Sequence, residues 1–308
     1  MRHEDSLEAL HLTGAWVTIG TFDGVHRGHQ ALIRTLVQDS AAADASAVVI
    51  TFTPHPLVAL RGSTGPYCLT SPANRARLLG ELGVDVVITL PFNADLAALN
   101  ADEFMQRVQR ALGLRHLRVG PDFALGRGRA GNVEKLRQIG AELGYEVSLF
   151  PTVTLDGEPV SSSRIRSALL AGEVGTAARL LGRLHSVEGL VVHGDGRGRG
   201  LGFPTANLDV SPSRLLPANG VYTTWAWAGG ERLPAVTNIG VRPTFNGEPA
   251  LRVEAHLLDI DRDLYGQVLQ LEFLSRLRTE QRFNSIDELM AQIRLDAQSA
   301  REVFAHAA

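Results

Sequence analysis

The stretch Ile-Gly-Thr-Phe-Asp-Gly-Val-His-Arg-Gly-His-Gln-Ala-Leu, residues 19–32, decides the architecture of the first half of the chain. It continues the apolar run 15–19, which is typical of a parallel strand buried on both faces. Gly20 and Gly24 permit a sharp turn, and apolar residues at 32, 33, 36 and 37 then follow at helical spacing. The stretch therefore predicts a strand, a glycine turn and a helix in succession.

Two histidines, His26 and His29, stand where this helix is predicted to begin. Residues three apart lie on one helix face. The free N–H groups and the dipole of a helix N-terminus favour anions, above all phosphate. Two imidazoles there could hydrogen-bond phosphate oxygens while charge moves onto a leaving group. The alternative interpretation is a pair of polar side chains on a solvated first turn.

The string His-Arg-Gly-His at 26–29 resembles the HxGH signature of the nucleotidyltransferases related to class I aminoacyl-tRNA synthetases. These enzymes join a phosphate or carboxylate to the α-phosphate of ATP and release pyrophosphate. The longer string TFDGVHRGHQ, residues 21–30, resembles the adenylyltransferase half of the bifunctional riboflavin kinase/FMN adenylyltransferases, the prokaryotic FAD synthetases. The resemblance implies catalytic roles for His26 and His29, and contacts with ATP or its phosphates for Gly20, Phe22, Asp23 and Gly28.

Length and composition limit the class of protein. A chain of 308 residues can form two domains with proper cores. The balance of 30 Lys+Arg against 33 Asp+Glu gives no basic field for nucleic acid. No apolar run approaches the roughly 18 residues of a membrane span, and the first residues have no apolar segment typical of a signal peptide. Because Cys68 is the only cysteine, an internal disulfide is impossible, which fits a cytoplasmic protein. We also expect no membrane or nucleic-acid partners, and a monomer or weak homo-oligomer.

The rest of the first half alternates apolar runs with helical periodicity. Strands that alternate with helices form parallel βαβ units, so the sequence predicts a doubly wound α/β domain. The resemblance implies that this domain is of the nucleotidyltransferase type. Ligands in such sheets bind beyond the carboxyl ends of the strands. The further strands are expected at 48–52, 84–87, 116–120 and 147–150, and the helices at 73–82, 102–112 and 133–143.

Three segments that follow predicted strands, 20–29, 53–56 and 120–126, are expected to converge at this edge of the sheet. The family resemblance implies that His55, Pro56, Asp122 and Phe123 line the flavin and nucleotide site, although Phe123 is equally suited to packing. The letters of 126–131 match G-x-G-x-x-G, but no strand directly precedes them. That pattern favours a surface loop over a dinucleotide site.

A run of three hydroxyls and two basic residues, Ser-Ser-Ser-Arg-Ile-Arg at 161–166, precedes another helical period. Hydroxyls at a helix start commonly serve as caps. Arginines beside them would make a clamp for a triphosphate. The family shows Ser-Ser-Thr-x-Ile-Arg here, and this chain has Ser163 in place of Thr. The resemblance implies ATP binding by Ser161, Ser162, Ser163, Arg164 and Arg166.

From Gly182 onward, short apolar runs replace the helical periods. Several short strands in series predict an antiparallel β-barrel or sandwich. A capping box at 285–288 begins a final helix that should pack on it. We therefore predict an α/β domain over 1–182 and a β-barrel domain with a C-terminal helix over 183–308. The expected strands are 187–193, 220–227, 233–239, 251–258 and 268–273.

The second half carries its own ligand signature, a loop rich in glycine and arginine at 194–200 followed by Gly-Phe-Pro-Thr-Ala-Asn at 202–207. Taken singly, Thr205 and Asn207 could be turn residues. Together the segment resembles the GFPTAN motif of riboflavin kinase, in which these two residues hold the Mg²⁺ of MgATP. Mg²⁺ prefers oxygen ligands, few protein groups and substrate phosphates. The resemblance implies kinase ATP binding by Gly194, Gly198, Gly200, Pro204, Thr205 and Asn207.

The strings at 238–245 and 253–259 also resemble riboflavin kinase. The resemblance makes Glu254 the base that accepts the proton of the ribityl hydroxyl, where an exposed strand glutamate is the alternative. The family implies two reactions with ATP and Mg²⁺: riboflavin to FMN, then FMN to FAD and pyrophosphate. Two other hypotheses are an adenylyltransferase for another phosphate ester with an inert β-domain, and a flavin carrier without catalysis.

Overall fold

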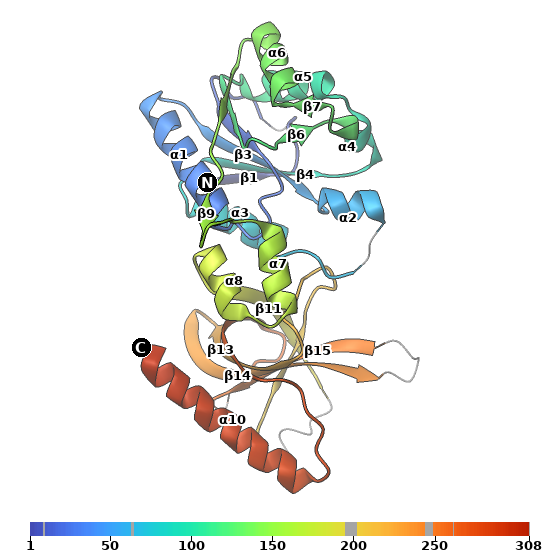
Figure 1. Cartoon of the computed structure of the whole chain (residues 1–308), viewed down its shortest axis with the longest axis vertical. Coiled ribbons are helices and arrows are strands. Elements are labelled where there is room, and N and C mark those ends of the chain that lie inside the picture. Colours follow the sequence, from blue (N-terminus) through green and yellow to red (C-terminus); the bar gives the residue numbers. More distant parts are fainter. Residues whose placement is uncertain (9, 63–64, 195–201, 244–248, 261, 308) are drawn as a thin grey trace. The chain divides into compact units, whose positions relative to one another are not determined.

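The computed structural model of the chain describes residues 1–308 except 9, 63–64, 195–201, 244–248, 261 and 308 (Figure 1). Contacts within the chain define two compact units, Met1–Ser162 and Ser163–Ala308. The first is an α/β unit and the second a β-barrel with a C-terminal helix, as the sequence predicts.

In the first unit, six strands among the described residues form one sheet in the order β1-β4-β3-β2-β5-β8, and every pairing is parallel. Five of them correspond to the predicted apolar runs. The edge strand β1 was not predicted because its residues, Arg-His-Glu, are polar. The strands are β1 Arg2–Glu4, β2 Trp16–Ile19, β3 Ala47–Thr53, β4 Val86–Pro91, β5 His116–Val119 and β8 Glu146–Leu149.

Helices cover both faces of this sheet. Alternate residues of β3 show it: Val48 and Ile50 pack into the cluster of α5 and α6, whereas Val49 packs into that of α1 and α3. Such two-sided burial explains why the strands are apolar throughout. The helices are α1 Arg27–Ala42, α2 Pro56–Arg61, α3 Pro72–Gly80, α4 Ala94–Ala98, α5 Ala101–Leu112 and α6 Val133–Leu143, and the short pairs are β6 Ala124–Leu125 with β7 Gly131–Asn132 and β9 Thr154–Leu155 with β10 Glu158–Pro159.

The order of strands reverses at β2, which lies between β3 and β5. In open parallel sheets a crevice forms outside the carboxyl ends of the strands at such a reversal. The turn that follows β2 and the loop that follows β5 flank this point, so the fold places the predicted segments where a ligand site is expected.

The second unit is a closed antiparallel barrel in the order β11-β12-β15-β14-β13-β16. The C-terminal helix α10, Ile286–Ala307, packs on it through Ala297, Ala300 and Phe304, whose ring lies 4.4 Å from that of Trp225. The strand β12 was not predicted; it has four residues, the first two of which end the GFPTAN segment. The strands are β11 His185–Val192, β12 Ala206–Asp209, β13 Gly220–Ala228, β14 Glu231–Pro243, β15 Pro249–Leu257 and β16 Val268–Arg278.

Two helices before the barrel, α7 Ser162–Leu170 and α8 Val174–Leu181, form a hairpin that packs on the barrel. The backbone N–H of Ala218 donates to the Leu169 carbonyl at 2.9 Å. The contacts thus divide the chain after Ser162, earlier than the domain boundary predicted after residue 182. The α8 side chains Val174, Ala177, Leu180 and Leu181 are almost fully buried.

We expect a fragment covering 163–308 to be more stable than one covering 183–308. The shorter fragment loses the apolar face of α8, and each fully buried apolar side chain contributes about 1.5–3 kcal/mol. Urea unfolding followed by circular dichroism should show a higher midpoint for the longer fragment. Equal midpoints would mean that the hairpin adds nothing to the stability of the barrel.

One histidine lies deep in the barrel unit. His185 is 2% exposed, and its Nε2 has no hydrogen-bond partner among the described residues. Burial lowers the pKa of His185 to about 3, and the positive charges of Arg214 and Arg183 act in the same direction. Between that value and its ordinary pKa of 6.5, the unfolded chain binds a proton that the folded chain does not.

The barrel should therefore lose stability as the pH falls below 6.5. From pH 7 to pH 5 the loss attributable to His185 is about 2 kcal/mol. Urea unfolding, followed by Trp225 and Trp227 fluorescence in a Trp16→Phe background, should show this loss in the parent and not in His185→Gln. The same pH dependence in both proteins would assign the effect to other groups.

Candidate functional site

The turn between β2 and α1 is unusual in its backbone. Phe22, Gly24 and Val25 all have left-handed conformations, with φ of 45°, 87° and 41°. Such conformations are uncommon for residues other than glycine and need compensation from their surroundings. Phe22 and Val25 are buried in the core beneath α1 and α3, and the Val25 N–H donates to the Phe22 carbonyl at 3.0 Å. Burial of two apolar side chains thus holds the turn.

His26 and His29 lie at the start of α1, as predicted. His26 is the N-cap, and its Nδ1 accepts the His29 N–H at 3.3 Å, which leaves Nε2–H as the donor of the neutral His26 ring. The two rings stack with centroids 3.5 Å apart, and Phe22 contacts His29 edge-on at 5.1 Å. A Cβ at Gly28 would lie 3.2 Å from the His26 ring, so glycine allows this close packing.

Asp23 and Arg75 are both buried beneath this turn. The Asp23 carboxylate accepts the N–H groups of Leu69 and Thr70 and the Thr70 hydroxyl, at 2.9–3.1 Å. The Arg75 Nη1 donates to the Thr21 carbonyl at 2.8 Å and also to Thr51 and Phe52. Arg75 was not identified from the sequence, because an arginine in a segment of helical periodicity is ordinarily exposed.

His55 and Pro56 follow the next strand, β3. His55 is buried as the N-cap of α2, with Nδ1 accepting the Leu57 N–H at 3.2 Å, and Pro56 is the first residue of that helix. The His55 ring contacts Tyr67 edge-on, with centroids 4.9 Å apart. A capping role is therefore observed for His55, and its predicted contact with a ligand remains untested.

The loop after β5 carries Asp122 and Phe123. The Asp122 side chain is exposed, and its carbonyl accepts a hydrogen bond from Arg129 at 3.1 Å. Phe123 packs against the core on the α5 and α6 side of the sheet, one of the two roles considered for it. The structure thus leaves Asp122 as the accessible side chain of this loop.

The serine segment begins at the histidine turn. The Ser162 hydroxyl donates to the Asp23 carbonyl at 2.8 Å, and the Val160 carbonyl lies 3.7 Å from the Cβ position of Gly28. Both contacts lie within the first unit and bring the segment 160–162 beside α1. The remaining predicted residues lie in the first turns of α7 in the second unit, with Ser163 exposed, Arg164 half-buried and Arg166 buried.

In the barrel, register places Glu254 between two asparagines. On β15 it is directly opposite Asn207 of β12 and Asn238 of β14, so the three side chains share one face. The Glu254 side chain is 29% exposed, and Arg252 lies 3.4 Å from its carboxylate. No role was predicted for Asn238, because only the strand register shows that Asn207, Glu254 and Asn238 form one row across three strands.

This row lines a cavity of about 480 Å³. Arg278 closes one side, where its guanidinium binds the buried Asp296 of α10 through hydrogen bonds of 2.8–3.1 Å. Its apolar side chains suit an aromatic ring, and its many polar side chains suit a ligand that also carries polar groups. The lining includes Phe203, Thr205, Asn207, Val221, Val236, Asn238, Arg252, Glu254, His256, Arg278, Glu280, Phe283, Leu289 and Ile293.

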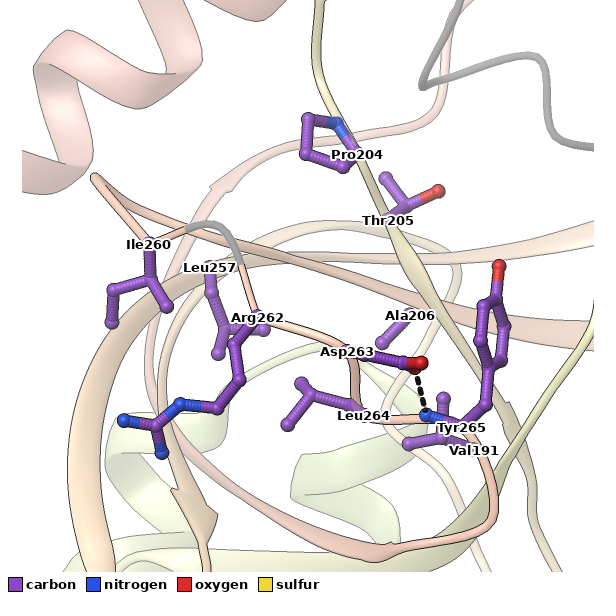
Figure 2. Close-up of a pocket in the computed structure, with 10 residues that line it drawn as sticks. All are labelled: Val191, Pro204, Thr205, Ala206, Leu257, Ile260, Arg262, Asp263, Leu264 and Tyr265. Carbon is purple, nitrogen blue, oxygen red and sulfur yellow. Dashed lines mark hydrogen bonds between the residues drawn. The ribbon is translucent and has the colours of Figure 1, made fainter.

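A smaller cavity of about 50 Å³ adjoins β12 (Figure 2). Thr205 lines both cavities, and Pro204 lines the smaller one. Figure 2 shows the Tyr265 ring beside the chain that carries Thr205. The ring of His193 packs on Tyr265 with centroids 3.9 Å apart. The Thr205 side chain thus lies where the two cavities come together.

Two further contacts order this region. The His256 Nδ1 lies 2.8 Å from the Pro204 carbonyl, and the Asn207 side chain packs so closely on Gly194 that no Cβ fits there. Gly198 and Gly200, also predicted to bind ATP, lie outside the described residues. No cluster of three His, Cys, Asp or Glu side chains suitable for a metal occurs in the part of the chain that the structure describes. Thr205 and Asn207 nevertheless supply the oxygen donors that Mg²⁺ prefers.

Two family models match two separate parts of the chain. The family model described as FAD synthetase matches residues 9–164, and the one described as riboflavin kinase matches residues 181–304. A bifunctional riboflavin kinase/FMN adenylyltransferase from Escherichia coli K12 is 40% identical over 94% of this chain and 93% of that protein. The protein of the same description from Pseudomonas fluorescens is 41% identical, covering 96% of this chain and 94% of that one.

A solved structure is also similar. A crystal structure described as a macrolide-efflux protein from Streptococcus pneumoniae has a TM-score of 0.86 at 32% identity, covering 97% of this chain and 98% of that chain. The term macrolide efflux describes the Streptococcus pneumoniae protein and is not carried over to this chain. Among the described residues of the present chain, we find no helix with the length and apolar character needed to cross a bilayer.

Proposed function

The chain belongs to the family of bifunctional riboflavin kinase/FMN adenylyltransferases, and from this premise we propose which of its residues carry out each reaction. Its C-terminal part phosphorylates riboflavin to FMN, and its N-terminal part adenylylates FMN to FAD. The proposal concerns ATP as the co-substrate of both steps, Mg²⁺ as the metal, and the site residues.

In the kinase, the flavin ring occupies the larger cavity and the ATP base binds near Tyr265 in the smaller one. The position of Thr205 on both cavities is the observation that carries this assignment. The γ-phosphate of ATP and the ribityl hydroxyl then meet at Thr205 and Asn207. Mg²⁺ held there with the ATP phosphates would offset their charge. Gly194, Gly198, Gly200 and Pro204 form the remaining ATP contacts.

Glu254 acts as the general base of this step. Its carboxylate faces the larger cavity between Asn207 and Asn238, where it can accept the proton of the ribityl hydroxyl. The hydroxyl oxygen attacks the γ-phosphorus and ADP leaves. Arg252, 3.4 Å from the carboxylate, orients it.

In the adenylyltransferase, the FMN phosphate attacks the α-phosphate of ATP and pyrophosphate leaves. His26 and His29 donate hydrogen bonds to the departing phosphates, while Ser161, Ser162, Ser163, Arg164 and Arg166 hold the triphosphate. Gly20 and Gly28 admit the nucleotide close to the backbone, and Phe22 orients His29 by ring contact. His55, Pro56, Asp122 and Phe123 surround the flavin and the nucleotide. Neither reaction needs a covalent enzyme intermediate.

Asp23 supports the same site through the backbone. Its carboxylate is buried and already accepts hydrogen bonds from Leu69 and Thr70, so we assign it the shaping of the phosphate-binding turn. We also propose that the protein works in the cytoplasm as a monomer or weak homo-oligomer, without membrane or nucleic-acid partners. The near-neutral charge and the single cysteine support this.

Replacing Glu254 by Gln tests the kinase assignment. Because Gln keeps the size but cannot accept the proton, riboflavin phosphorylation should fall about 10²–10⁴-fold. FMN adenylylation by the same protein should stay near normal. Parallel assays fed riboflavin or FMN, with flavins resolved by chromatography, measure both. Glu272→Gln, on β16 outside both cavities, is the control; an unchanged kinase rate in Glu254→Gln would make Glu254 a solvated strand residue.

Replacing His29 by Ala tests the other site. Loss of one hydrogen bond to the leaving group should reduce FAD formation from FMN about 10²–10³-fold. Riboflavin phosphorylation should persist, and a circular dichroism spectrum like that of the parent would show that the first unit is folded. The exposed His11 provides the matched control His11→Ala. An intact adenylylation rate in folded His29→Ala would refute the role given to this imidazole.

A further inference from the structure

The α7–α8 hairpin carries residues proposed for adenylylation and packs on the kinase barrel. Its first turns carry Ser163, Arg164 and Arg166, which we propose to hold the ATP triphosphate during adenylylation. Its second helix, α8, contacts β11 and β16 of the kinase barrel, and the Ala218 N–H donates to the Leu169 carbonyl of α7. The barrel thus fixes a helix whose start serves the other reaction.

One barrel residue, Arg276 of β16, fastens the turn of this hairpin. Its Nη1 donates to the Ala171 carbonyl at 3.4 Å, and its Nη2 donates to the Asn219 carbonyl. The guanidinium also lies over the ring of Tyr222, whose hydroxyl donates to the Ala218 carbonyl. Arg276 therefore connects the hairpin turn with the loop that precedes β13.

Two glycines make room for this guanidinium. A Cβ at Gly172 would lie 2.5 Å from Arg276 Nη1, and a Cβ at Gly220 would lie 2.9 Å from its Nε. Real Cβ atoms do not approach other heavy atoms so closely. The guanidinium therefore lies close against the backbone at both Gly172 and Gly220, and a side chain at either position would displace it.

We propose that Arg276 is a positioning residue for FMN adenylylation, although it lies in the kinase barrel. Arg164 and Arg166 lie within about two helical turns of Ala171 on the same helix, so a shift of the turn moves both. A misplacement of 1 Å in a group that binds a substrate can reduce a rate about 10²-fold. The inference rests on the proposed role of the serine–arginine segment.

The test compares both activities of the same full-length chain. In Arg276→Met, kcat/KM for ATP in FMN adenylylation should fall about 10- to 100-fold. Riboflavin phosphorylation should stay within about twofold, because no atom of Arg276 lines either kinase cavity. Arg276→Lys, which keeps the charge and one donor group, should recover part of the loss.

A second variant approaches the contact from the hairpin. Gly172→Ala places a Cβ against the guanidinium and should reproduce the selective loss. Its control is Gly230→Ala in the β13–β14 turn: Gly172 and Gly230 both have positive φ, 78° and 87°, but nothing lies within 4 Å of the Gly230 Cβ position. Backbone strain alone should therefore leave the ratio of the two activities unchanged.

Three results would overturn the inference: unchanged adenylylation in Arg276→Met, a parallel decline of both activities, or the same selective loss in Gly230→Ala. Arg166→Ala separates this failure from that of the proposed function. If Arg166→Ala lowers adenylylation and Arg276→Met does not, only the positioning role is wrong. If Arg166→Ala has no effect, the assignment of the segment to ATP fails and the inference fails with it.

Discussion

The buried guanidinium of Arg75 is the constraint on which the first unit depends. A charge taken out of water is costly unless it is compensated. Here one nitrogen, Nη1, donates to groups after β2 and at the end of β3, and so ties together the two strand ends that carry His26 and His55. Burial lowers the pKa of Arg75, and the nearby Asp23 carboxylate opposes that shift. The turn after β2, the N-cap of α1 and the stacked histidines all follow directly on the segment that Arg75 binds at Thr21.

Much of the fold could be predicted because burial leaves a direct trace in the sequence. Parallel strands covered on both faces are apolar throughout, so β2 to β5 and β8 were located from composition alone. The exceptions follow from the same physics. The polar residues of β1 pair at an edge, and β12 is too short for a period. The boundary predicted after Gly182 follows a change in local pattern, whereas the contacts of α8 with β11 and β16 are tertiary and leave no local signal.

The candidate sites likewise contain residues that the sequence predicts and residues that only the structure brings into view. Short motifs pointed to His29 and Glu254, because spacing within one segment is visible in the sequence. Partners that come from other strands were not visible. Asn238 joins Glu254 only through the β14–β15 register, and His193 meets Tyr265 across a long stretch of chain. Arg75 and Arg276 were missed because a charged side chain in a periodic segment is ordinarily exposed, and only packing shows what it binds.

The place of Thr205 on two cavities has a thermodynamic consequence. If flavin in the larger cavity changes the affinity for nucleotide in the smaller one by some factor, nucleotide must change the affinity for flavin by the same factor. Titrating each ligand with and without the other would reveal whether that factor differs from one. If it does, a binding constant for one of these ligands holds only at a stated concentration of the other. Analogues that fill one cavity would report on the occupancy of both.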